Sequence, residues 1–246
     1  MPDSALAELA ARLVAIDSVN PGLIAGAAGE RELAFFVSDW CEGRGLEVEL
    51  VPPADRPSVI AVARGSGGGR SLLLNAHLDT VGVEGMDAPH WPRFESGRLY
   101  GRGAYDMKGA LAAILDAASR VSGLRGDVIV TAVADEELAS IGTEAVLERV
   151  RADAAIVVEP TELRLAVAHK GFVGFTIETR GVAAHGSRPH LGVDAIAKMG
   201  PVLVALEALD QRLQSGREHP LVGPGSLHAS LIEAATSSRA TRHAAC

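Results

Sequence analysis

The chain has 246 residues, 48% of them hydrophobic, and its 23 basic and 31 acidic residues give a formal net charge of −8. This length and apolar content suffice for a sizeable core, while the acidic balance argues against binding to the phosphate backbone of nucleic acid. Charges or glycines interrupt every apolar run before the ~20 residues of a membrane span, and Cys41 and Cys246 lack CxxC spacing. We therefore expect a cytoplasmic protein with neither nucleic acid nor membrane as a partner.

The first part of the chain predicts two helices and two strands. Residues 1–20 carry spaced Leu and Ala rather than a basic segment and an unbroken apolar one, which indicates an amphipathic helix and not a secretion signal. Residues 30–41 predict a second amphipathic helix. Neighbouring strands follow at 46–51 and 58–63. We interpret the glycine-rich segment 64–69 (RGSGGG) as a hairpin turn rather than a phosphate-binding loop, because no Lys-Ser or Lys-Thr pair follows it.

Three apolar runs predict the centre of an α/β domain. Residues 71–75, 127–133 and 154–158 are nearly continuous in apolar character, as expected of strands that helices cover on both faces. An amphipathic stripe over 106–122 predicts a helix between the first two strands, and 141–150 predicts one between the latter two. The order strand, helix, strand, helix, strand implies right-handed crossovers in a mixed, largely parallel sheet.

The chain divides into a larger α/β domain and a smaller α+β unit. We expect residues 1–167 to form a three-layer domain, with helices on both faces of the sheet. After it, the spacing predicts a strand at 172–179, a long helix at 193–213 and a further strand at 226–232. Residues 168–233 therefore begin a second domain.

Each of the three buried strands is followed by residues that can bind a metal ion. His77 and Asp79 follow the first strand, 135–137 (DEE) follow the second, Glu159 follows the third, and Asp106 precedes the intervening helix. The carboxyl ends of strands in open α/β sheets face one crevice, so these side chains are expected to converge. One imidazole among carboxylates, without a thiolate, suits Zn²⁺, Co²⁺ or Mn²⁺. A cation would also relieve the repulsion among the carboxylates.

The short spacings indicate separate roles for these residues. Asp79 is close enough in sequence to reach the imidazole nitrogen of His77 that faces away from a metal, which fixes the tautomer. Glu136 and Glu137 point in different directions if extended, so one can bind metal while the other holds the attacking water. Singly, each residue is more often an ordinary exposed polar group, and DEE alone would fit a solvated turn before a helix. Their coincidence favours a catalytic metal site.

Several motifs occur in order along the chain. They are HLDTV (77–81), GRGAYDMKG (101–109), DEE (135–137), VEP (158–160), and HKG (169–171) with GVAAHGS (181–187). At these points the sequence resembles the co-catalytic zinc aminoacylase and carboxypeptidase family, peptidase family M20, which includes acetylornithine deacetylase, succinyl-diaminopimelate desuccinylase and glutamate carboxypeptidase. Motifs in a fixed order are far more specific than one motif.

The resemblance implies two divalent metal ions, with zinc first and Co²⁺ or Mn²⁺ as alternatives. His77 and Glu159 would bind one ion, Glu137 would bind the other, and Asp106 would bridge both. The set includes only one histidine ligand, because the family supplies its last metal-binding histidine from a later part of the catalytic domain.

The resemblance also implies catalytic roles. Glu136 would be the general base, and Asp79 would orient His77. The unit over 168–233 would be part of the family's lid and dimerisation domain. Its His185 would reach the active site of a partner subunit and stabilise the developing oxyanion, so a homodimer is implied. The alternative for His185 is a structural loop residue.

The function implied is metal-dependent hydrolysis of the amide bond in a small N-acyl amino acid, as in acetylornithine deacetylase or succinyl-diaminopimelate desuccinylase. A metallo-exopeptidase or dipeptidase that acts on short peptides is the alternative within the enzymes. An inactive fragment that only binds metal or a partner is the alternative of another class. The motifs do not separate the substrates.

The chain departs from the family pattern near Ala234. A second strand and helix of the lid are expected there, but residues 234–246 (AATSSRATRHAAC) show no hydrophobic period and predict an irregular tail. His243 is a poor substitute for the family's last histidine ligand. We therefore expect a C-terminally truncated member of the family.

Overall fold

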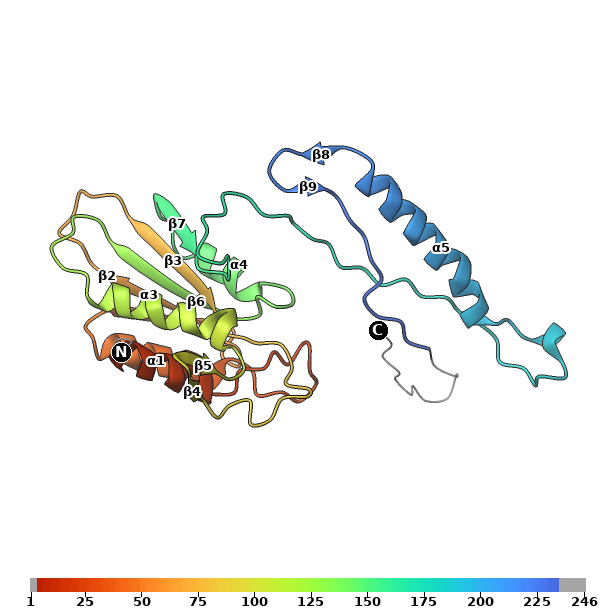
Figure 1. Cartoon of the computed structure of the whole chain (residues 1–246), viewed down its shortest axis with the longest axis horizontal. Helices are drawn as coiled ribbons and strands as arrows, with labels where there is room; N and C mark the ends of the chain where they lie inside the picture. Colours follow the sequence, from red (N-terminus) through yellow and green to blue (C-terminus); the bar gives the residue numbers. More distant parts are fainter. Residues whose placement is uncertain (1–3, 235–246) are drawn as a thin grey trace. The chain divides into compact units, whose positions relative to one another are not determined.

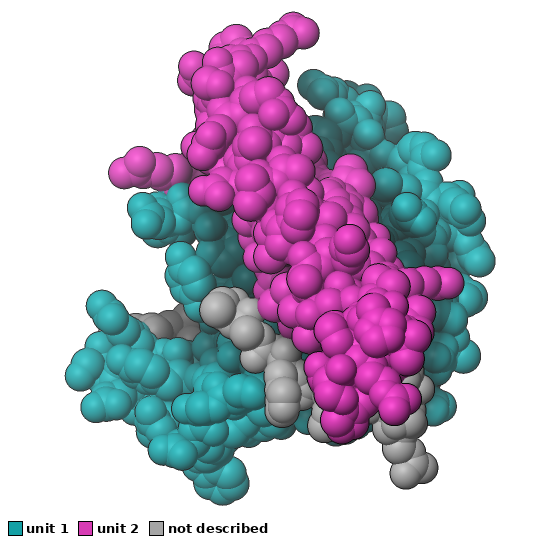
Figure 2. Space-filling view, turned by 90° about the vertical axis from the view of Figure 1, so that its right-hand side faces the viewer, with its two compact units in different colours: residues 1–163 teal, residues 164–246 magenta. Residues whose placement is uncertain are grey.

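The computed structural model describes residues 4–234. The chain divides into two compact units, Met1–Leu163 and Arg164–Cys246 (Figure 2). No helix in the described range is both long and apolar enough to cross a membrane. Except for Ala234, the predicted tail at 234–246 lies outside the described residues, and so does His243.

The described part of the first unit contains α-helices on both faces of a sheet (Figure 1). They are α1 (Ser4–Ala15), α2 (Arg31–Glu42), α3 (Gly109–Ser119) and α4 (Ile141–Leu147). The first three pack on one face and α4 packs on the other. Each helix overlaps a segment whose hydrophobic spacing predicts it, so these predictions are confirmed.

A mixed sheet forms the middle layer. Its strands are β1 (Glu47–Val51), β2 (Ser58–Ala63), β3 (Leu72–His77), β6 (Val128–Val133) and β7 (Ala154–Val157), in the spatial order β1-β2-β6-β3-β7. Strand β3 pairs in parallel with both β6 and β7, whereas the β1–β2 and β2–β6 pairs are antiparallel. The predicted α/β class and mixed sheet are confirmed.

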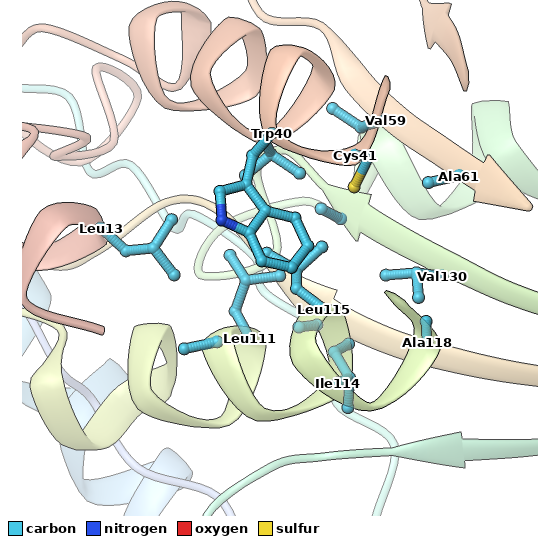
Figure 3. Packing of buried hydrophobic residues seen from close by; sticks show 14 of the residues in the cluster. Leu13, Trp40, Cys41, Val59, Ala61, Leu111, Ile114, Leu115, Ala118 and Val130 are labelled. Carbon is cyan, nitrogen blue, oxygen red and sulfur yellow. The ribbon is translucent and has the colours of Figure 1, made fainter. Parts of the chain in front are cut away.

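The two sides of the sheet bury alternate residues, as the pleat of a strand requires. In β2, Val59 and Ala61 face the layer of α1, α2 and α3, and Ile60 and Val62 face the layer of α4. Figure 3 shows part of the first layer, where Trp40 and Leu115 meet. All of β6 is buried, because both of its faces are covered.

Strand β7 does not match the prediction of a strand covered on both faces. All of its residues are exposed. The reason is its position: β7 lies at the edge of the sheet, while α4 contacts β1, β2 and β6. Apolar composition predicted the strand correctly but did not predict its place in the sheet.

The prediction of a hairpin turn at the glycine-rich segment 64–69 is wrong. Strand β6 lies between β2 and β3 and pairs with both. The segment is a loop that packs against the turn before β6, where the Asp127 carboxylate accepts a hydrogen bond from Gly65 N at 2.8 Å. The choice between neighbouring and separated strands depends on this long-range pairing, which no local pattern encodes.

A hairpin that the sequence analysis missed joins β4 (Arg93–Glu95) and β5 (Arg98–Tyr100). Its two-residue turn is Ser96-Gly97, and both residues have positive φ, 49° and 76°. Gly97 adopts this conformation at little cost, and a short polar residue before glycine is a recognised hairpin signal.

The second unit contains one long α-helix among its described residues, α5 (Ala195–Gln214). This confirms the prediction of a helix at 193–213. Asp194 caps the helix, because its Oδ1 accepts a hydrogen bond from Ala197 N at 3.0 Å. A short 3₁₀ turn (Pro189–Leu191) precedes the helix, and the two-residue strands β8 (Glu218–His219) and β9 (Gly223–Pro224) follow it.

The strands predicted at 172–179 and 226–232 are not formed, and these predictions are wrong. Both segments lack strand assignments in the structure. Side chains that an alternating strand would bury on one face, Val173, Phe175 and Ile177, are exposed. Strand formation by such a pattern depends on a partner strand and on a surface that buries one face, and the described residues of this unit supply neither.

Candidate metal centre

The register of the sheet brings the predicted ligands to one rim. His77 ends β3 and stands opposite Val133 at the end of β6, while Asn75 stands opposite Val157 at the end of β7. The residues that follow β6 and β7 therefore emerge beside His77, as expected at the carboxyl ends of parallel strands.

Asp106 reaches the same rim from a different element. It lies in a π-helical turn (Ala104–Lys108) that leads into α3. The backbone of Asp106 is not helical, with φ −123° and ψ 100°, so the predicted helix at 106–122 begins later, at Gly109. This local departure from helical geometry places the carboxylate against the end of β3.

The ligand atoms gather around the imidazole of His77. Its Nε2 lies 3.0 Å from Asp106 Oδ1 and 4.0 Å from both Glu136 Oε2 and Glu159 Oε1. Two groups of residues could each hold a metal ion, because the ligand atoms within each group lie no more than 4.8 Å apart. The first group is His77, Glu136 and Glu159, and the second is His77, Asp106 and Glu137. The structure thus brings together every residue that the sequence analysis proposed as a metal ligand.

His77 is almost fully buried, with 1% of its side chain exposed, and its other ring nitrogen is held by Asp79. Nδ1 lies 2.8 Å from the backbone carbonyl of Asp79 and 3.6 Å from Oδ1 of its carboxylate. The carbonyl is therefore the nearer partner. An N–H on Nδ1 that donates to this carbonyl leaves Nε2 free to bind a cation.

The carboxylate of Asp79 mainly holds the loop after β6. Its Oδ1 accepts a hydrogen bond from Glu136 N at 3.0 Å, and its Oδ2 accepts one from Glu137 N at 3.1 Å. Asn20 Nδ2 donates to the same Oδ2 at 2.7 Å. Asp79 thus links the strand that carries His77 to the two glutamates.

The electrostatics of the site favour a bound cation. Burial raises the pKa of Glu136, Glu137 and Glu159, and the neighbouring carboxylates add to this effect, whereas the charge of His77 opposes it. The pKa of Glu159 rises to about 7. Burial alone would lower the pKa of His77, but the charges of Asp79 and Glu159 raise it. These shifts report crowded negative charge, which a divalent cation would neutralise. The donor set of imidazole and carboxylate oxygen fits such an ion.

Two residues beside the site were missed by the sequence analysis. Lys108 is fully buried, and its Nζ donates to the carbonyl of Ile16 at 2.7 Å. Burial lowers the pKa of Lys108 to about 7. Asn20 is buried as well and contacts Asp79. Lys108 stands beside the apolar residues at the start of α3, and a charged residue in such a place could have indicated a buried role. The sequence around Asn20 contains no comparable indication.

His185 belongs to the second unit, where its side chain is exposed. Its Nδ1 lies 2.8 Å from Ser187 Oγ. The role of His185 in a partner's active site therefore stays a prediction.

Comparison with known proteins gives matches over most of the chain. Residues 73–197 match the family described as peptidase family M20/M25/M40, and residues 167–241 match the peptidase dimerisation domain. The chain is 33% identical over 223 residues to acetylornithine deacetylase of Erwinia tasmaniensis. The aligned region covers 86% of this chain and 57% of that relative. The chain thus spans little more than half the length of this curated relative.

Several solved structures share the fold, among them a metallo-carboxypeptidase and a tripeptidase. An M20 family metallo-carboxypeptidase from Sulfolobus solfataricus gives a TM-score of 0.55 at 24% identity, over 64% of this chain and 37% of that one. A tripeptidase from Staphylococcus aureus gives a TM-score of 0.53 at 19% identity, over 86% of this chain and 56% of that one.

Proposed function

Because this chain belongs to peptidase family M20/M25/M40, we propose that it is a metal-dependent hydrolase that cleaves the amide bond of N-acyl amino acids. The observation that carries the proposal is the convergence of a buried imidazole and carboxylates from three strand ends and one turn. The 33% identity to an acetylornithine deacetylase supports an acyl amino acid as the substrate class.

Two divalent ions, with Zn²⁺ first, are proposed for the site. His77 and Glu159 would hold one ion, Glu137 would hold the other, and Asp106 would bridge them. The two groups of neighbouring ligand atoms support this arrangement, although they share His77 and the first includes Glu136. When bound, such ions polarise the amide carbonyl and lower the pKa of water towards neutrality.

Glu136 is the proposed general base. Its carboxylate lies near His77 at the rim, and its backbone is fixed by Asp79. Burial raises the pKa of Glu136 above its usual range, and this brings its proton affinity closer to that needed for transfer near neutral pH. Glu136 would take a proton from the attacking water and pass it to the leaving amine.

The second unit is the proposed lid and dimerisation element, and its residues 167–241 match the dimerisation domain. A homodimer would let His185 donate a hydrogen bond to the oxyanion that develops on a substrate in the partner's active site.

We propose the cytoplasm as the compartment of this protein, in keeping with the free thiol of Cys41.

The test is an assay of the purified chain with N-acetylornithine, N-succinyl-diaminopimelate and a dipeptide, each with and without a chelator. We expect hydrolysis of an acyl amino acid that stops on chelation and returns with Zn²⁺ or Co²⁺. Preference for the dipeptide would instead favour an exopeptidase. Metal binding without turnover of any substrate would favour a binding fragment, and turnover unaffected by complete metal removal would contradict the proposed mechanism.

A further inference from the structure

A buried network of charged and polar side chains lies next to the candidate metal centre. We call it the Arg56 network, and its members are Asn20, Glu30, Arg56, Asp79 and Asp135. Arg56 belongs to the loop between β1 and β2, and Glu30 immediately precedes α2. Glu30, Asp79 and Asp135 are buried, while Arg56 is 16% exposed.

Arg56 binds two carboxylates and an amide at once. Its Nε donates to Glu30 Oε2 at 2.9 Å, and its Nη2 donates to Asn20 Oδ1 at 3.1 Å. The same Nη2 lies 2.8 Å from Asp135 Oδ1. Asn20 Nδ2 in turn donates to Asp135 Oδ1 at 3.0 Å and to Asp79 Oδ2 at 2.7 Å. A planar guanidinium suits this geometry better than an ammonium group.

The network holds the backbone of the loop that carries Glu136 and Glu137. The backbone amides of residues 134–137 donate in turn to Ser58 Oγ, Glu30 Oε1, Asp79 Oδ1 and Asp79 Oδ2, at 3.0–3.1 Å. The acceptors come from segments distant in sequence. The path of this loop is therefore set by remote side chains.

Asp135 has a backbone conformation that depends on such support. Its φ is 63°, in the left-handed region, which is costly for a residue other than glycine. Its N–H donates to Glu30, and its carboxylate faces Arg56. The turn at Asp135 determines the direction in which the next two glutamates leave β6.

We propose that Arg56 is a positioning residue, which acts through Glu30 and Asp135 to aim Glu136 and Glu137 at the metal centre. This inference rests on the proposed function of the site, and it adds a residue from outside the motifs. Arg56 pairs with both Glu30 and Asp135, which would otherwise be buried with no positive charge beside them. It contacts neither the proposed ligands nor the proposed base.

The experiment compares Arg56→Lys with Arg64→Lys. Arg64 is a matched control, because it also bridges two carboxylates, Glu47 and Asp127, but is 56% exposed and lies at the opposite end of β2. Hydrogen exchange of the amides of residues 134–137, the affinity for Co²⁺ and the visible spectrum of bound Co²⁺ are measured for both variants and the wild type.

We expect Arg56→Lys to remain folded but to exchange these amides at least about 10-fold faster, with a Co²⁺ affinity about 10–100-fold weaker and an altered spectrum, as for other residues that orient metal ligands. Arg64→Lys should match the wild type in all three measurements. Unchanged exchange in Arg56→Lys, or equal changes in both variants, would overturn the proposal.

Two further conditions keep the test decisive. If Arg56→Lys does not fold, the triple variant Glu30→Gln/Arg56→Met/Asp135→Asn replaces it, since removing all three charges leaves none of them buried and unpaired; unchanged exchange in that variant would again overturn the proposal. If the wild type binds no metal, the proposed function fails, while hydrogen exchange still decides whether Arg56 holds the loop.

Discussion

Asp106 Oδ1 lies 3.0 Å from His77 Nε2, although the two residues are 29 positions apart in the sequence. His77 is buried, whereas the Asp106 side chain is 50% exposed. The imidazole of His77 is thus the buried ligand of the candidate metal centre, and the carboxylate of Asp106 contacts it from the solvent side.

Replacing His77 should abolish tight metal binding. We expect His77→Gln to weaken the affinity for Zn²⁺ or Co²⁺ by about 100-fold or more, because both ligand groups contain His77 and even the loss of an orienting partner weakens binding by about 10–100-fold. Calorimetric titration measures the change. The control is His190→Gln, which alters an exposed histidine; equal affinities in the two variants would rule out His77 as a ligand.

Removing the charge of the proposed base should separate turnover from metal binding. We expect Glu136→Gln to lower kcat by about 10²–10⁴-fold while the ions proposed at His77, Asp106, Glu137 and Glu159 stay bound. Steady-state kinetics and metal analysis of the same sample give both numbers. Glu144→Gln, on an exposed position of α4, should be unaffected. Near-normal turnover in Glu136→Gln would remove this residue from the mechanism.

A cavity under α3 should destabilise the first unit. Leu115 is fully buried in the layer that includes Trp40 and Leu111 (Figure 3). We expect Leu115→Ala to lower the free energy of unfolding by about 2–5 kcal/mol. Urea unfolding followed by circular dichroism measures it. Leu124→Ala, at an exposed leucine, should change it by less than about 0.5 kcal/mol. A similar loss in both variants would contradict the packing described.

The thiol of Cys41 should be unreactive in the folded protein. Burial raises the pKa of Cys41 to about 12 from 9.0, despite the opposing charge of Arg44. The folded state therefore holds the thiol proton of Cys41 more tightly than the unfolded state does. The contribution of the protonated thiol to the free energy of unfolding is complete below pH 9 and is lost as the pH rises towards 12.

A disulfide exchange reagent measures this protection at pH 8–10 in the Cys246→Ala variant, which leaves Cys41 as the only thiol. We expect slow reaction in buffer and rapid reaction in denaturant. Equally fast reaction in both conditions would show that Cys41 is accessible in the fold.

The sequence predicts much of the first unit, because its signals are local. Hydrophobic spacing identifies the helices and the strands, and ligand-type residues after β3, β6 and β7 predict the rim at which they meet. The strand order was not predicted: the position of β6 between β2 and β3 follows from long-range pairing. The hairpin at Ser96-Gly97 was also missed, although its turn residues were a usable signal.

The rest of the site was hidden because it depends on tertiary contacts. Arg56 and Glu30 belong to separate loops and look like ordinary surface charges in the sequence, yet the fold pairs them in its interior. In the second unit, Val173, Phe175 and Ile177 alternate with other residues in the sequence but are exposed in the structure. Their alternation predicts a strand, but a strand forms only against a partner, and the described residues provide none.

Strand β7 has one further consequence for handling the protein. It lies at the edge of the sheet, with Ile156 and Val157 exposed. An edge of this kind is a template on which a strand of another molecule can add by backbone hydrogen bonds. Concentrated samples of this chain are therefore expected to self-associate through β7, and Val157→Lys should lower the aggregated fraction in size-exclusion chromatography without disturbing the buried layers.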